Sequence, residues 1–209
     1  MDKLSLFCHV PTKNVLSVHD CSSLYAVPVL LMEQGLVNVL EERLKLSLPT
    51  PIEKSILLSK WKQLVVRNER LYDEVSIVLV GKYTQLQDSY ISVVKSLQHA
   101  SLSINRKLKL EWVEAEELEP EMQTEDPLKY HNAWKKVVSA KGILVPGGFG
   151  NRGTEGKIAA IKWARENKIP FLGICLGLQL AVIEFARNIC GLQGNFIHLL
   201  IVKMPILLN

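Results

Sequence analysis

The chain has 209 residues, a formal net charge of +4 and 48% hydrophobic residues. This length allows one large domain, or one domain and a fragment of another, and the apolar content excludes a wholly disordered chain. Lys and Arg are scattered, so no nucleic-acid-binding stripe is indicated. The longest apolar stretch, residues 196–208, is too short to span a bilayer. We therefore expect neither nucleic acid nor membrane among the partners.

The four cysteines, Cys8, Cys21, Cys175 and Cys190, show no paired spacing. A disulfide framework or a zinc site requires closer, patterned cysteines. No charged segment precedes an apolar one at the start, so no secretory signal is predicted. These observations favour a reducing, cytoplasmic location and no metal site.

The first part of the chain reads as a small α/β segment. Strands are predicted at residues 4–7 and 15–18, and helices at 23–34 and 36–46 with Gly35 between them. This is too little sequence to bury a core alone. Pro49 and Pro51 then favour an extended linker, and a helix is predicted from residue 52 to about residue 70.

From residue 75 onward, strands alternate with helices. The predicted strands are 75–80, 107–113, 142–145 and 169–174, and the predicted helices are 89–101, 128–138, 154–167 and 176–188. This alternation predicts an α/β fold with a doubly wound, mostly parallel sheet. Ligands of such sheets bind at the carboxyl ends of the strands, where two segments of unusual sequence occur.

The first segment, residues 146–153, is rich in glycine and lies between a strand and a helix. It contains a formal G-x-G-x-x-G pattern made by Gly148, Gly150 and Gly153. A dinucleotide site also needs an acidic residue at the end of the next strand, but that strand runs into Cys175. A Walker A loop fails because Ile158 follows Lys157 where Ser or Thr is required. A glycine-rich turn without a ligand and a backbone cradle for an oxyanion both remain open.

The second segment is Gly-Ile-Cys-Leu-Gly at residues 173–177. This G-x-C-x-G pattern between a strand and a helix is the cysteine version of a nucleophile elbow. A sharp turn would expose the thiol of Cys175, and the N–H of Leu176 would point at the carbonyl under attack. The alternative is an unreactive cysteine buried at a tight turn.

At these two strand ends the chain resembles class I glutamine amidotransferases. The resemblance rests on residues 143–150, 153–157 and 171–179, and Gly-Gly-Phe-Gly-x-Arg-Gly-x-Glu-Gly narrows it to the CTP synthases. Residues 7–10, 18–20, 27–35 and 80–83 look like the end of a synthetase domain and the start of an amidotransferase domain. The resemblance covers about residues 1–188, and the chain looks like a truncated or alternatively spliced form.

The resemblance implies a flavodoxin-like amidotransferase fold that is incomplete at its C-terminus. The implied divisions are 1–47, an α/β remnant of the synthetase domain; 48–74, a linker with a helix; 75–188, the amidotransferase domain; and 189–209, an unmatched apolar tail. The family makes CTP from UTP, ATP and glutamine in pyrimidine biosynthesis, as a ligase that hydrolyses glutamine through a cysteine thioester. ATP and Mg belong to its synthetase region, GTP activates it, and its subunits form homo-oligomers. No cofactor is expected in this chain.

The resemblance also assigns site residues. Cys175 is the implied nucleophile, with oxyanion N–H groups from Gly147 and Leu176. The implied glutamine contacts are Gly148, Leu176, Gly177, Leu178 and Gln179. Lys82, Phe149 and Arg152 are the implied contacts of allosteric GTP.

The chain departs from the family after Cys175. The family pairs its cysteine with a His and a Glu that lie close together, whereas here only His198 and Glu184 follow. The position of Glu184 predicts a surface or capping role. We therefore expect incomplete catalysis, since turnover needs a base for the thiol. The alternative is a non-catalytic truncated isoform that binds full-length CTP synthase subunits. A different cysteine hydrolase with the same type of elbow is less favoured. Such enzymes carry a His soon after the nucleophile, often as the next residue, and in this chain that position is Leu176.

Overall fold

The computed structural model describes residues 1–46 and 51–192. The chain divides into two compact units, Met1–Tyr72 and Asp73–Asn209. The predicted linker at 48–51 lies almost entirely outside the described residues, and the apolar stretch 196–208 lies wholly outside them.

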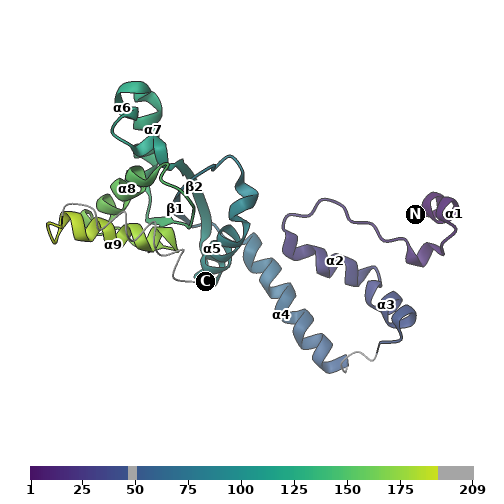
Figure 1. Cartoon of the computed structure of the whole chain (residues 1–209). Helices are drawn as coiled ribbons and strands as arrows, with labels where there is room; N and C mark the ends of the chain where they lie inside the picture. Colours follow the sequence, from purple (N-terminus) through teal and green to yellow (C-terminus); the bar gives the residue numbers. More distant parts are fainter. Residues whose placement is uncertain (47–50, 193–209) are drawn as a thin grey trace, which may run out of the picture. The chain divides into compact units, whose positions relative to one another are not determined.

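The described part of the first unit is helical (Figure 1). Its elements are α1 (Asp2–Cys8), the short 3₁₀ helices η1 (Thr12–Asn14) and η2 (Leu24–Ala26), α2 (Val27–Glu33), α3 (Leu36–Leu44) and α4 (Pro51–Glu69). The predicted helices are confirmed, and Gly35, at φ 84°, separates α2 from α3. The described residues of this unit form no strand, so the strands predicted at 4–7 and 15–18, and with them an α/β remnant, are wrong.

Both errors have a physical reason. An apolar run of four residues fits a helix as well as a strand, and residues 4–7 lie within α1. A strand also needs a neighbouring strand whose N–H and C=O groups form hydrogen bonds with its own. At Ser17 the side chain of Gln34 fills that need, since the Ser17 N–H donates to Gln34 Oε1 and Gln34 Nε2 donates to the Ser17 carbonyl, both at 2.7 Å.

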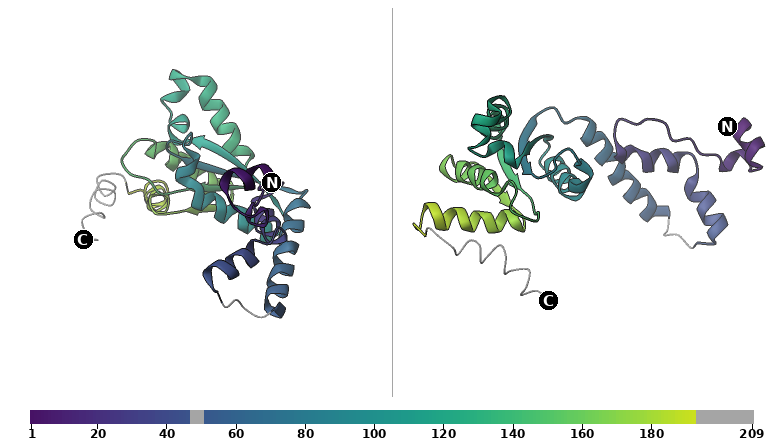
Figure 2. Two further views of the ribbon diagram at one scale, coloured as in Figure 1. Left: turned by 90° about the vertical axis from the view of Figure 1, so that its right-hand side faces the viewer. Right: turned by 45° about the horizontal axis from the view of Figure 1, so that its top comes forward.

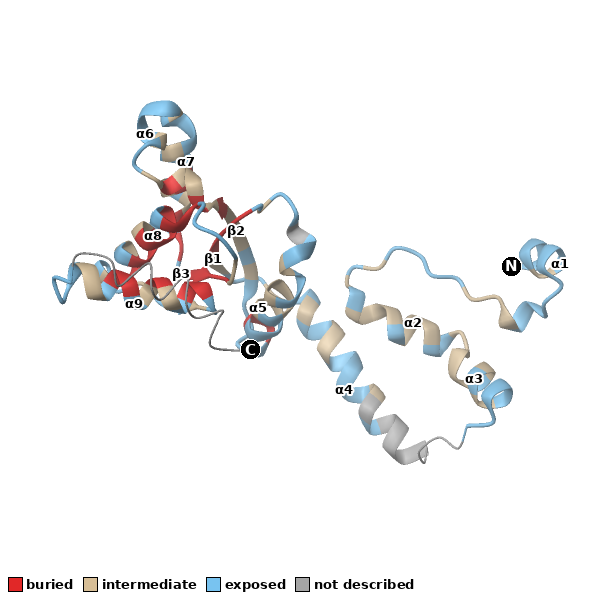
Figure 3. Cartoon of the chain, in the orientation of Figure 1, coloured by how far each residue is buried: buried red, intermediate tan, exposed pale blue. Residues whose placement is uncertain are grey.

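Helix α4 is joined to the segment around α2 by polar contacts. Trp61 Nε1 donates to the Tyr25 carbonyl at 2.7 Å, and Lys62 pairs with Glu33 at 3.1 Å. None of the side chains described in this unit is buried, as its short length predicts (Figure 3). Among the described helices, none by itself has both the length and the apolar content to cross a membrane; Leu24–Glu33 and Leu36–Leu44, bent by 66°, satisfy these criteria only when joined.

The second unit alternates strands and helices as predicted. Its elements are β1 (Glu74–Gly81), η3 (Gln87–Tyr90), α5 (Ile91–Ser103), β2 (Lys107–Glu114), η4 (Ala115–Leu118), α6 (Met122–Glu125), α7 (Pro127–Ser139), β3 (Gly142–Val145), α8 (Thr154–Glu166), β4 (Phe171–Gly173) and α9 (Leu176–Asn188). The elements η4 and α6 were not predicted.

The four strands form one parallel sheet in the order β2-β1-β3-β4. This confirms the predicted doubly wound sheet. Right-handed crossovers place α5 on one face and α7 and α8 on the other, with α9 beside α8 (Figures 1 and 2). The winding reverses between β1 and β3, so the carboxyl ends of β1, β3 and β4 lie together.

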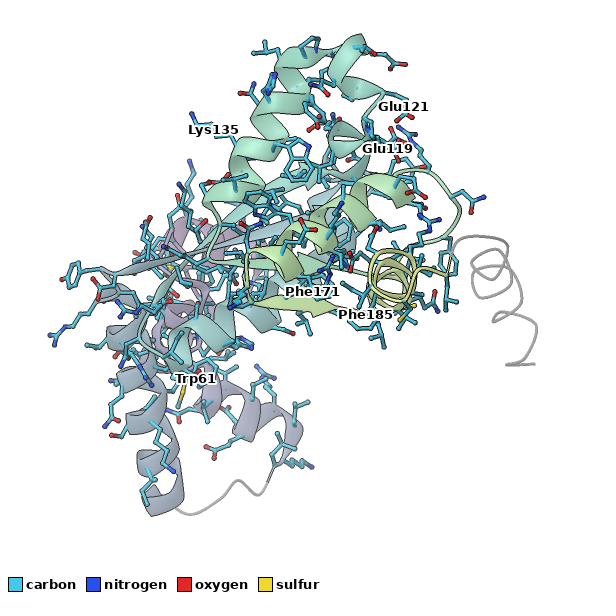
Figure 4. The ribbon with its side chains drawn as sticks, turned by 90° about the vertical axis from the view of Figure 1, so that its left-hand side faces the viewer. Trp61, Glu119, Glu121, Lys135, Phe171 and Phe185 are labelled. Carbon is cyan, nitrogen blue, oxygen red and sulfur yellow. The ribbon has the colours of Figure 1, made fainter. Side chains whose placement is uncertain are left out.

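The core of this unit lies between the sheet and the helices α7, α8 and α9. Its larger buried residues are Val78, Val80, Val113, Leu118, Val137, Ile143, Val145, Ile158, Ile161, Leu176, Leu180 and Ile183. The outer elements retain exposed apolar surface: Phe185 on α9 is 50% exposed, and Phe171 on the edge strand β4 is partly buried (Figure 4). The core therefore fixes the strand ends that carry the site.

Candidate active site

Cys175 lies on a strained turn between β4 and α9. Its backbone has φ 52° and ψ −109°, and the residue is exposed. A positive φ is costly for a residue with a side chain, by about 1–3 kcal/mol, and such strain persists only where the surroundings impose it. Helix α9 begins at Leu176, so the Leu176 N–H is one of the groups without an intrahelical acceptor. This is the geometry of a nucleophile elbow.

The two glycines of the elbow allow three backbones to meet. A Cβ at Gly173 would lie 2.7 Å from the carbonyl group of Gly177. A Cβ at Gly177 would lie 2.0 Å from the carbonyl oxygen of Val145. Neither contact is possible for a larger residue, so close packing of β3, β4 and α9 requires glycine at both positions.

Gly147 lies directly beside the thiol. Val145 pairs with Gly173 in the sheet, and Gly147 and Cys175 each follow their strand by two residues. A Cβ at Gly147 would lie 3.4 Å from Cys175 Cβ and 3.8 Å from its Sγ. Gly147 and Leu176 therefore flank Cys175, one across the sheet and one along the chain. Their donation to an oxyanion stays a prediction.

The glycine-rich loop after Gly147 packs on η4. Gly153 has φ 69°, and a Cβ there would lie 2.8 Å from Ala115 Cβ. A Cβ at Gly156 would lie 1.8 Å from the Ala115 carbonyl oxygen. This close approach explains Gly153 and Gly156 by packing, so the formal G-x-G-x-x-G pattern does not require a nucleotide.

Lys82 ties the end of β1 to this loop. Its Nζ donates to the carbonyl oxygens of Phe149 at 2.9 Å and Gly150 at 2.7 Å. Burial lowers the pKa of the Lys82 ammonium, the charge of Arg152 lowers it further, and Glu119 and Glu114 act in the opposite direction. Lys82 therefore holds the loop from the side of the neighbouring strand.

The predicted GTP contacts come together on this loop. Phe149 is 97% exposed. The Arg152 guanidinium donates to Glu116 at 2.7 Å and lies 5.4 Å from the centre of the Tyr83 ring. The loop thus presents an exposed aromatic ring close to a fixed guanidinium and Lys82. Binding of GTP there stays a prediction.

The predicted glutamine contacts differ in accessibility. Leu176 and Gly177 are buried, Gly148 and Gln179 are partly buried, and Leu178 is 59% exposed. A Cβ at Gly148 would lie 3.8 Å from Leu176 Cδ2, so these two residues come together from β3 and α9. Gly177 faces Val145 under the elbow. Their contact with glutamine remains a prediction.

Glu184 has a different place from the one predicted. It is 1% exposed, and the Arg165 guanidinium donates to both of its carboxylate oxygens, at 2.8 Å and 3.0 Å. Asn188 Nδ2 adds a third bond at 3.0 Å. The hydrogen bond from Arg165 lowers the pKa of the Glu184 carboxyl. The predicted surface or capping role is therefore wrong: Glu184 is a buried carboxylate whose ion pair with the partly exposed Arg165 joins α8 to α9.

Lys157 is a prominent site residue that the sequence reasoning did not single out. Its side chain is 0% exposed, and its Nζ has no hydrogen-bond partner within the described part of the chain. Burial lowers the pKa of the Lys157 ammonium to about 8, aided by Lys82 and opposed by Glu114. The signal was the spacing of Lys157, Ile161 and Ala164, which puts the lysine on the core-facing side of α8.

His198, the histidine that follows Cys175 in the sequence, lies outside the described residues. Across residues 1–46 and 51–192, no three His, Cys, Asp or Glu side chains are grouped so that they could hold a metal ion. The described site therefore consists of an exposed thiol, flanking backbone groups and a loop held by lysine.

The chain belongs to the class-I glutamine amidotransferase family, whose model matches residues 85–205. A second model, that of the CTP synthase N-terminus, matches residues 1–46. The resemblance to CTP synthases is thereby confirmed. The amidotransferase match continues past residue 188, so the expectation that the family resemblance ends there is wrong.

Several curated relatives are CTP synthases. The chain is 58% identical over 187 residues to CTP synthase 2 of Xenopus laevis, covering 90% of this chain and 32% of that protein. It is 55% identical over 201 residues to CTP synthase of Schizosaccharomyces pombe, covering 94% of this chain and 33% of that protein. It is 54% identical over 194 residues to CTP synthase 1 of Homo sapiens, covering 92% of this chain and 32% of that protein. The chain thus spans about a third of the length of these relatives.

A solved structure is also similar, the glutaminase domain of Trypanosoma brucei CTPS with bound acivicin. Its sequence is 43% identical, the TM-score is 0.49, and the match covers 56% of this chain and 42% of that chain.

Proposed function

We propose that this chain is the glutamine-activating part of a CTP synthase. The observation that carries the proposal is the strained elbow of Cys175 with Gly147 beside its thiol. In the proposed step, the Cys175 sulfur attacks the carboxamide carbon of glutamine and forms an S–C bond. The N–H groups of Gly147 and Leu176 hold the oxyanion, the proton given up by the Cys175 thiol passes to the amide nitrogen, and ammonia leaves when the C–N bond breaks. In a complete site, water would then hydrolyse the thioester and release glutamate.

The remaining steps would belong to a synthetase region. There, ammonia would convert UTP to CTP with ATP and Mg, and GTP would act at the loop of Lys82, Phe149 and Arg152. The glutaminase step itself requires no cofactor. The cytoplasmic location and the homo-oligomer with full-length subunits belong to the same proposal.

The first test is covalent labelling of Cys175. We expect acivicin, a glutamine analogue, to label Cys175 of the purified 209-residue chain, with glutamine slowing the reaction. Cys190 is an exposed thiol outside the elbow and is the internal control. Peptide mass spectrometry reports both sites. Equal labelling of Cys175 and Cys190, or no protection by glutamine, would remove the proposed function.

The second test is turnover. The carboxylate of Glu184 is engaged by Arg165 and Asn188, so it is not available to orient a catalytic histidine. We therefore expect glutamate release by the 209-residue chain to match that of its Cys175→Ala variant, with or without GTP. A wild-type rate at least tenfold above Cys175→Ala would show that the chain completes the reaction.

The engaged Glu184 also favours a second candidate, a chain that binds full-length subunits without catalysis. Co-purification of a tagged chain with full-length CTP synthase, at a glutaminase rate equal to that of Cys175→Ala, would support this function. Absence of any complex would exclude it.

A further inference from the structure

The ammonium of Lys157 is buried next to the Gly147–Gly148 segment, and no described residue is its hydrogen-bond partner. A Cβ at Gly148 would lie 3.6 Å from Lys157 Nζ, so the missing side chain leaves the ammonium facing the loop backbone. An unpaired charge is expensive to bury, and native proteins seldom retain one without a use.

The charged groups nearby do not neutralise it. Lys82, on the β1 side, is also positive, and its Nζ is bonded to the loop carbonyls. Glu114, at the end of β2, attracts the ammonium. Its carboxylate, however, already accepts hydrogen bonds from the N–H groups of Tyr83 and Thr84 and from the Thr84 hydroxyl, at 2.9–3.0 Å. Glu114 therefore attracts the Lys157 ammonium from a distance, but Lys157 Nζ has no hydrogen-bonded counter-charge among residues 1–46 and 51–192.

Two adjacent glycines separate this charge from the thiol. Gly148 lies beside Lys157 Nζ, and Gly147 lies beside the Cys175 side chain. Since adjacent Cα atoms are about 3.8 Å apart, the ammonium and the sulfur lie within about 14 Å of each other. A loop without side chains leaves little to screen the field between them, and charges at this range interact measurably inside a protein.

We propose that Lys157 supplies the positive charge that offsets the negative charge formed at Cys175. Its role rests on the proposed function of Cys175 as nucleophile. Lys157 does not touch the substrate: it is a positioning residue that acts through the loop, favouring the thiolate before attack and the oxyanion after it.

The test is the alkylation rate of Cys175 by iodoacetamide, a neutral reagent that needs no glutamine site. The thiol loses its proton to the buffer, the thiolate forms an S–C bond, and iodide leaves. Near pH 6.5, where Lys157 is charged, we expect Lys157→Met to react about three- to tenfold more slowly than wild type. At pH 9.5, where wild-type Lys157 is neutral, the two rates should converge.

Two variants serve as controls. Lys162→Met removes an exposed lysine from the same helix and should leave the rate unchanged. Lys157→Arg keeps a charge at this position, so at pH 6.5 it should react like wild type and faster than Lys157→Met. A purely structural role of Lys157 would give slow reaction at both pH values.

The wild-type protein provides a further readout that no variant's folding can obscure. Coupling to Lys157 predicts a rise of the rate with pH that is broader than a single ionisation, because loss of the Lys157 charge near pH 8 opposes formation of the thiolate. A single-step rise, or equal rates for wild type and a folded Lys157→Met at pH 6.5, would overturn the proposal. Failure of acivicin labelling, by contrast, would tell against the proposed function only.

Discussion

Replacing Gly177 with alanine is expected to lower the free energy of unfolding of the second unit by about 3 kcal/mol or more. The new Cβ would lie 2.0 Å from the Val145 carbonyl oxygen, a backbone atom that cannot move without disrupting β3. Since β3 and α9 also position Gly147 and Cys175, acivicin labelling should fall with stability. Urea unfolding followed by circular dichroism measures the effect.

Gly148→Ala is the matched control. Its Cβ would contact Lys157 Nζ at 3.6 Å and Leu176 Cδ2 at 3.8 Å, which are ordinary van der Waals distances. We expect a change in the free energy of unfolding of about 1 kcal/mol or less. Similar urea midpoints for Gly177→Ala and wild type would contradict the packing described for the elbow.

The second large effect is expected at the ion pair between α8 and α9. Glu184→Gln removes the charge-assisted bonds from Arg165 and should cost about 1.5–3 kcal/mol of stability. Arg165→Met should be more damaging, because it leaves the buried Glu184 carboxylate with Asn188 as its remaining side-chain donor. Thermal unfolding at pH 7 compares the two variants.

The same pair predicts a pH dependence. The pKa of Glu184 is lowered in the folded state from its ordinary value of 4.5, chiefly by the hydrogen bond from Arg165. The stabilisation is therefore fully present well above pH 4.5 and is lost as the pH falls through the lowered pKa. Between pH 7 and pH 3, stability should fall less steeply in Glu184→Gln than in wild type. Parallel pH profiles would mean that Glu184 is not ionised in the folded unit.

The elements of the second unit were predictable because their apolar patterns are long and their ends are marked. Residues 75–80 are β-branched or aliphatic except for Ser76, and β1 ends at the glycine that follows them, Gly81. The predicted bounds of β3 and α9 match those observed. The elbow was predictable for the same reason, since G-x-C-x-G between a strand and a helix leaves few alternatives.

The missed features depend on contacts between distant residues. Nothing in the local sequence of Glu184 shows that Arg165 lies opposite it, since α8 and α9 become neighbours only in the folded unit. Lys157 is charged, and charged residues on a helix are usually exposed, so its core-facing position was overlooked. In the first unit, residues 4–7 are helical because no described strand lies beside them to pair with. A run of four apolar residues does not show whether such a neighbouring strand exists.

The contrast in burial between the two units affects calorimetry. The heat-capacity change of unfolding is set mainly by the apolar surface that becomes exposed, and globular proteins average about 12–15 cal/mol/K per residue. Residues 1–46 and 51–72 include no buried side chain among those described, so their unfolding adds little to this quantity. The sheet and its helices supply most of it. A calorimetric trace of the chain therefore reports on Cys175 and its supporting core, and says almost nothing about α1 to α4.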